Sequence, residues 1–101
     1  MARCPYAKLE DLENELDDIR NWEFIKEPKP GIFYLRSKPF MHFHTEDGKR
    51  WADVRSGLDW GPQIEIPFKA SAKYGKTFLT RVEKCYLESL KAMRLGVRPN
   101  S

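Results

Sequence analysis

Two histidines and an aspartate form the one group in this sequence whose residue types and spacing could do chemistry. His42 and His44 are the only two histidines of the chain, and side chains at positions i and i+2 of a strand point to the same face. Imidazole nitrogens and carboxylate oxygens can bind a metal ion, with Asp53 as a third ligand. Asp53 could instead orient an imidazole by a hydrogen bond. A plain polar sheet face remains the simplest alternative.

A predicted β-hairpin brings these residues together. Residues 40–44 and 50–55 are rich in β-forming types and flank Asp47-Gly48, a pair typical of a two-residue type I′ turn. This turn places His42 opposite Asp53 and His44 opposite Trp51. One face of the hairpin is then wholly apolar, which selects this register. Its members are Met41, Phe43, Ala52 and Val54. The second face carries the candidate ligand-binding residues, which are Phe40, His42, His44, Trp51, Asp53 and Arg55.

The flanking segments predict an α+β fold. Leucines and an isoleucine recur every three or four residues over 5–21, which indicates an amphipathic helix. Residues 22–26, 32–36 and 63–66 are predicted strands. A second helix is predicted from about residue 77 to residue 96, although Thr80 and Glu83 could form a capping box that starts it later. We therefore expect a helix, an antiparallel sheet of about five short strands, and a carboxy-terminal helix, with both helices on one face.

Size and composition predict one globular domain spanning residues 1–101, with residues 97–101 frayed. The chain has 101 residues, of which 41% are hydrophobic and 33% charged. Apolar runs are too short to cross a bilayer, and the first residues do not resemble a signal peptide. Cys4 and Cys85 have no metal-site spacing, so we expect a cytoplasmic protein with free thiols. A disulfide between the two cysteines is the alternative.

Charge is distributed unevenly along the chain. The net charge is −3 over residues 1–30, zero over 31–67 and +6 over 68–101. The acidic first helix and the basic last helix are expected to attract each other. A basic tail could instead favour phosphate-bearing partners.

The second sheet face could also serve macromolecular partners. If the helices cover only one face, a homodimer could form through Phe33, Leu35, Phe40 and Trp51. The aromatic and histidine side chains could alternatively stack single-stranded nucleic acid. The neutral strand region and the absence of known RNA-binding motifs make nucleic acid the weaker alternative.

Motifs for nucleophilic catalysis and nucleotide binding are missing. Ser37, Ser56 and Ser71 lie outside any G-x-S-x-G sequence, and neither of the two glycine-rich phosphate-binding patterns occurs. We therefore predict no cofactor.

The stretch from Met41 to His44, followed by Ala52-Asp53-Val54 and a carboxy-terminal helix, resembles a small uncharacterised bacterial family labelled "luciferase domain". The resemblance rests on a His-x-His then Ala-Asp order and covers about a third of the chain. It implies that His42, His44 and Asp53 mark a site. It implies no light-emitting reaction, since 101 residues are too few for a flavin-dependent luciferase barrel.

Three functions follow as hypotheses. The first is a non-catalytic module that binds a small ligand or a protein. The second is a small metal-dependent or general-base enzyme that uses His42, His44 and Asp53. The third is a weak binder of single-stranded nucleic acid.

Overall fold

The computed structural model describes residues 2–97 and confirms the α+β fold. Its elements follow in the order β1 (Ala2–Arg3), the 3-10 helix η1 (Tyr6–Leu12), α1 (Glu13–Arg20), β2 (Ile25–Lys29), β3 (Ile32–Leu35), β4 (Lys38–Glu46), β5 (Lys49–Ser56), β6 (Asp59–Trp60), β7 (Ile64–Glu65) and α2 (Ala72–Val97). No helix within residues 2–97 is both long and apolar enough to cross a membrane.

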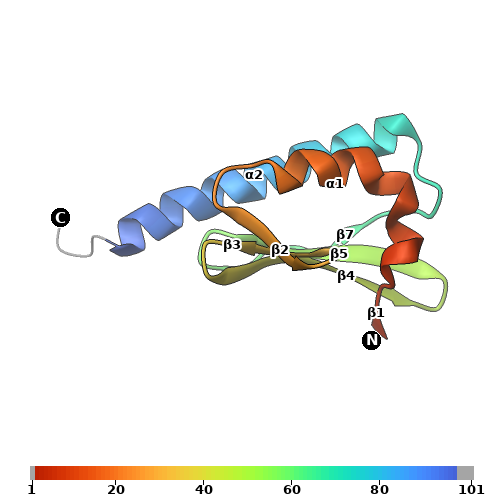
Figure 1. Cartoon of the computed structure of the whole chain (residues 1–101), viewed down its shortest axis with the longest axis horizontal. Coiled ribbons are helices and arrows are strands. Elements are labelled where there is room, and N and C mark those ends of the chain that lie inside the picture. The colour runs from red at the N-terminus through yellow and green to blue at the C-terminus, as the bar shows by residue number, and fades with distance from the viewer. Residues whose placement is uncertain (1, 98–101) are drawn as a thin grey trace.

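The sheet is antiparallel, and β4 and β5 form its centre. Its strands are ordered β2-β3-β4-β5-β6, while β1 also pairs with β4 and β7 with β5. Both helices lie on one side of this sheet and leave the other side open (Figure 1). We call these sides the covered face and the open face.

The β4–β5 hairpin has the predicted register. His42 pairs with Asp53, and His44 pairs with Trp51. Asp47 and Gly48 both have positive φ, as a type I′ turn requires. The turn is tight because Glu46 and Lys49, the residues on either side of it, are still paired.

The covered face and the helices share one hydrophobic cluster. The first helical segment buries its predicted stripe of Leu9, Leu12, Leu16 and Ile19. The residues from Tyr6 to Leu12 form a 3-10 helix rather than an α-helix. The strands bury Phe33, Leu35, Phe40, Met41, Phe43, Ala52, Val54 and Ile64 against them.

The first predicted strand is displaced. Residues 22–24 form a turn in which Phe24 has a φ of +69°, and β2 begins only at Ile25. Trp22 instead packs on Tyr86 of α2, with ring centroids 4.8 Å apart. The strand then runs through Pro28 to Lys29, beyond the predicted end at residue 26. Proline is tolerated there because β2 is an edge strand.

The second helix begins five residues earlier than residue 77. Ser71 accepts a hydrogen bond from the backbone of Tyr74 (3.3 Å) and caps the helix start. Gly75 and Ser89 lie in the buried stripe of α2, so the apolar pattern has gaps at both positions. A Cβ at position 75 would meet the Glu15 carboxylate of α1, so that flexible side chain would have to move if Gly75 were replaced. The frayed residues that we predicted lie largely outside the described range.

Candidate functional site

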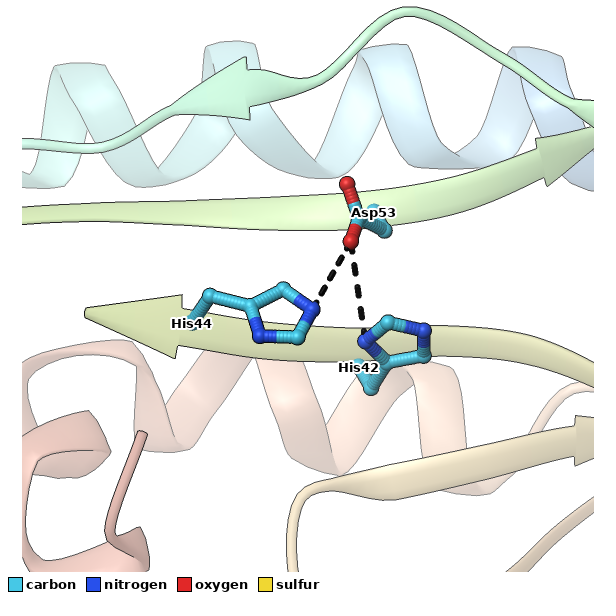
Figure 2. Close-up of side chains that lie close together, drawn as sticks. All are labelled: His42, His44 and Asp53. Carbon is cyan, nitrogen blue, oxygen red and sulfur yellow. Dashed lines mark ion pairs between the residues drawn. The ribbon is translucent and has the colours of Figure 1, made fainter. Parts of the chain in front are cut away.

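The hairpin holds His42, His44 and Asp53 together on the open face. His42 and His44 project from β4, and Asp53 projects from the neighbouring strand β5 toward both of them (Figure 2). One potential ligand atom from each residue lies within 4.8 Å of the other two. The predicted grouping of these three residues is therefore confirmed.

One carboxylate oxygen serves both imidazoles. Oδ2 of Asp53 lies 2.8 Å from Nε2 of His44 and 3.8 Å from Nδ1 of His42. The first distance is that of a hydrogen bond, whereas the second is too long for one. The other oxygen of Asp53, Oδ1, accepts a hydrogen bond of 3.0 Å from Gln63 Nε2.

The three side chains are largely withdrawn from solvent. Their exposed fractions are 19% for His42, 13% for His44 and 19% for Asp53. Burial lowers the pKa of His42, and electrostatic interaction with His44 and Arg3 lowers it further, although Asp53 opposes this shift. His42 is consequently neutral near pH 7, with a free lone pair on one ring nitrogen.

Aromatic rings enclose the two imidazoles. The ring of His42 meets that of His44 edge-on, with centroids 4.7 Å apart, and meets that of Trp60 at 5.0 Å. Trp51 lies 5.7 Å from the ring of His44. Arg55 lies over the Trp60 ring at 4.9 Å and donates hydrogen bonds to backbone carbonyls of Pro39 and Leu58. Arg55 therefore anchors the β6 segment.

Three buried polar atoms of this face have no hydrogen-bond partner within the described chain. They are Nδ1 of His42, Nδ1 of His44 and Nε1 of Trp51. Such atoms are rare in proteins, since each loses its hydration without compensation. Their concentration on neighbouring residues of β4 and β5 marks the open face as a place where an additional group could bind.

A pocket of about 400 Å³ opens next to the histidines. Its lining consists of Arg3, Pro28, Lys29, Ile32, Tyr34, Pro39, His42 and Trp60. Two of these side chains carry a fixed positive charge and none is acidic. Five strands, β1, β2, β3, β4 and β6, contribute to this lining, so the pocket is a product of the tertiary fold.

The candidate residue Phe40 belongs to the other face. Met41 pairs with Phe33 while Pro39 pairs with Tyr34, which leaves Phe40 as an extra residue in a β-bulge. The bulge turns its side chain into the core, where it is 0% exposed and meets Tyr86 of α2 edge-on at 6.2 Å. Phe40 was therefore wrongly assigned to the ligand-binding face.

Most of the residues expected to form a homodimer contact are also not on the open face. Phe33 and Leu35 are, like Phe40, fully buried beneath the helices. The stacking platform for nucleic acid loses Phe33 and Phe40 for the same reason. Trp51 alone of the expected dimer residues lies on the open face, and it is partly buried there. Cys4 and Cys85 are both free, so the alternative of a disulfide is wrong as well.

Sequence reasoning missed several residues of this site. Trp60 arrives through the short strand β6, which a turn at Gly57 folds back onto β5. Arg3 arrives because β1 pairs with β4, where Arg3 faces His44. The only local signal for Trp60 is Gly57, which lies between the predicted strands at residues 50–55 and 63–66. Nothing local could have signalled Arg3.

No family model matches this chain, and searches of curated proteins and of solved structures find no similar protein. The resemblance to the "luciferase domain" family therefore stays a prediction, and the open face is the feature of the molecule that indicates a function.

Proposed function

We propose that this protein is a binding module that holds a small organic anion in the pocket beside His42. The observation that carries the proposal is the make-up of that pocket. Arg3 and Lys29 supply fixed positive charge, Trp60 and Tyr34 supply aromatic surface, and no carboxylate lines it. Its volume of about 400 Å³ lies within the range of small-molecule sites.

These side chains favour a ligand with two parts. A carboxylate or phosphate group would receive charge-assisted hydrogen bonds from Arg3 and Lys29. A flat apolar group would pack on Trp60, which is 44% exposed and whose ring already contacts Arg55 and His42. An anchored ring loses little entropy on binding, which supports affinity.

The free cysteines fit a reducing environment, and we include a cytoplasmic location in the proposal. We do not include a homodimer, because three of the four side chains expected at its contact are in the core.

Titration with four ligands of similar size and different charge tests the proposal. Phenyl phosphate, benzoate, phenol and benzylamine are added to the isotope-labelled protein, and amide and indole NMR shifts are followed. We expect phenyl phosphate to bind most tightly and benzoate next, with shifts centred on Trp60 and Tyr34. Phenol and benzylamine should not saturate the site.

Substitutions then locate the anion. Arg3→Gln and Lys29→Gln should each weaken phenyl phosphate binding about tenfold, because each removes a charge-assisted hydrogen bond of about 1.5 kcal/mol. Lys26→Gln is the matched control, since Lys26 is an exposed lysine of the same strand outside the pocket. Equal losses in all three variants, or equal binding of phenol and phenyl phosphate, would contradict the proposal.

A further inference from the structure

We propose that His42, His44 and Asp53 form a zinc-binding site with two nitrogen ligands and one oxygen ligand. The site does not rest on the anion-binding pocket. Although His42 borders both, the other two ligands do not line the pocket, and the cationic and aromatic residues of the pocket are not ligands.

The distances between the donor atoms suit zinc. Zinc binds imidazole nitrogen and carboxylate oxygen at about 2.0–2.2 Å, so tetrahedral ligand atoms lie about 3.3–3.5 Å apart. Asp53 Oδ2 lies 2.8 Å from the His44 nitrogen and 3.8 Å from the His42 nitrogen, so one distance is somewhat shorter and the other somewhat longer than this range. The whole group spans no more than 4.8 Å. Small rotations of side chains would therefore bring all three atoms to bonding distance.

A metal ion would also provide a partner for a buried nitrogen atom that accepts or donates no hydrogen bond within the described chain. Nδ1 of His42 has no hydrogen-bond partner within the described chain. Asp53 Oδ2 lies 2.8 Å from Nε2 of His44, whereas Nδ1 of His42 stays 3.8 Å away from that oxygen. One cation placed between the three side chains would contact both nitrogens and the oxygen at once, which no single proton can do.

Neighbouring side chains fix the ligands in place. Gln63 donates a hydrogen bond to Oδ1 of Asp53 and leaves Oδ2 directed at the histidines (Figure 2). Metal-binding carboxylates commonly have such a partner. The rings of Trp60 and Trp51 lie against the two imidazoles and restrict their rotation.

The donor set selects the class of ion. Two imidazoles with one carboxylate suit zinc and its transition-metal neighbours, whereas magnesium and calcium prefer oxygen ligands alone. Three protein ligands leave the fourth position of a tetrahedral zinc ion open to an exogenous ligand.

Zinc titration of the untagged full chain tests the site, because a histidine tag would itself bind the metal. We expect one zinc per chain after gel filtration and a Kd at or below about 1 µM by chelator competition. The imidazole NMR signals of both histidines should change together and stop changing at one equivalent. Magnesium chloride at the same concentration should leave them unchanged.

Variants assign the ligands. His44→Ala and Asp53→Ala should each weaken zinc binding at least about 100-fold, and Gln63→Ala about tenfold, as loss of a supporting hydrogen bond does. Asp59→Asn is the carboxylate control, from the adjacent strand β6 and outside the group. The double variant Cys4→Ser/Cys85→Ser controls for binding by thiols. Both controls should bind zinc as the parent chain does.

Several results would overturn the zinc site. They are the absence of stoichiometric change in the imidazole signals, unchanged affinity in His44→Ala, or loss of zinc in the cysteine variant. The NMR result on the unmodified chain decides the matter if a variant fails to fold. Phenyl phosphate binding that survives His44→Ala, and zinc binding that survives Arg3→Gln, would separate this site from the anion pocket.

Discussion

The two faces of the sheet differ in how far their buried polar groups are hydrogen-bonded. On the covered face, Arg50 is 1% exposed, and its two terminal nitrogens donate four hydrogen bonds, leaving only Nε without a partner. Two of these bonds reach the carboxylate of Asp11 in η1. On the open face, His42, His44 and Trp51 each keep a buried atom without a partner in the described chain.

This difference separates the requirements of folding from those of binding. A buried charge on the covered face is tolerable because the protein itself supplies the partners. The open face keeps polar side chains whose partners the protein does not supply, although apolar residues would pack there without that cost. Local conflicts of this kind are expected where a protein binds something else.

The largest effect on stability should come from the apolar part of the covered face. Phe43→Ala removes a ring that is 1% exposed and should lower the free energy of unfolding by about 3–5 kcal/mol. Urea denaturation measures the loss. Phe24→Ala is the matched control, since Phe24 is 43% exposed and should cost less than about 1 kcal/mol. Similar losses in the two variants would mean that burial on the covered face does not stabilise the protein as described.

A smaller loss in the free energy of unfolding should follow when the hydrogen bonds between Arg50 and Asp11 are weakened. Asp11→Asn removes the negative charge that receives both terminal nitrogens of Arg50. Its expected cost is about 1.5–3 kcal/mol, the range for hydrogen bonds to charged groups. Glu10→Gln, at the neighbouring exposed position, should stay near the parent value. An Asp11→Asn variant as stable as Glu10→Gln would contradict the structural role of this pair.

The same pair predicts how stability changes in acid. Hydrogen bonds from Arg50 are the main reason that the pKa of Asp11 lies below its usual value. A carboxyl group with a lowered folded pKa stabilises the protein above its unfolded pKa, about 3.9, and loses this contribution as pH falls through the folded value. Denaturation between pH 5 and pH 2 should therefore show a steeper loss in the parent chain than in Asp11→Asn. Parallel pH profiles would contradict this assignment.

The smallest effect on stability is expected on the open face. His44→Val removes an imidazole with a buried unpartnered nitrogen and introduces a good strand former. The substitution also removes the 2.8 Å contact between the imidazole and Asp53. Because this loss offsets the gain, the free energy of unfolding should stay within about 1 kcal/mol of the parent, while zinc binding is lost. Thermal and urea denaturation in the presence of a chelator measure the first part.

A reciprocal substitution on the covered face sharpens this prediction. Val54→Thr places a hydroxyl at a position that is 0% exposed and should cost about 1–3 kcal/mol. A large loss in His44→Val together with a negligible one in Val54→Thr would reverse the comparison between the faces.

The parts of the fold that depend on local pattern could be predicted from the sequence. Alternation along residues 40–44 and 50–55, with Asp47-Gly48 between them, was enough to pair His42 with Asp53 correctly. The face of Phe40 could not be predicted in this way. The bulge that reverses its side chain arises where β3 pairs with β4, which the hairpin pattern does not contain.

The remainder of the site depends on contacts between distant segments. Arg3 reaches the pocket through pairing with a strand about 40 residues away, for which a single sequence carries no local signal. Trp60 belongs to a strand of two residues, too short to show any alternation. The early start of α2 could not be predicted because Gly75 lies at a buried position of the helix, facing Glu15 of α1. Glycine at that position interrupts the apolar pattern that would indicate a helix.

The proline in β2 has a consequence for the behaviour of the chain in concentrated solution. An edge strand offers unpaired backbone groups to which strands of other molecules can add, the first step toward fibrous aggregates. Pro28 has no backbone N–H to donate, and a register irregularity between Lys26 and Lys29 distorts the strand. The positive charges of these two lysines also repel a second copy of the same strand. The β2 edge is thus a poor template for intermolecular strand addition, which should help the protein to refold without forming fibrils.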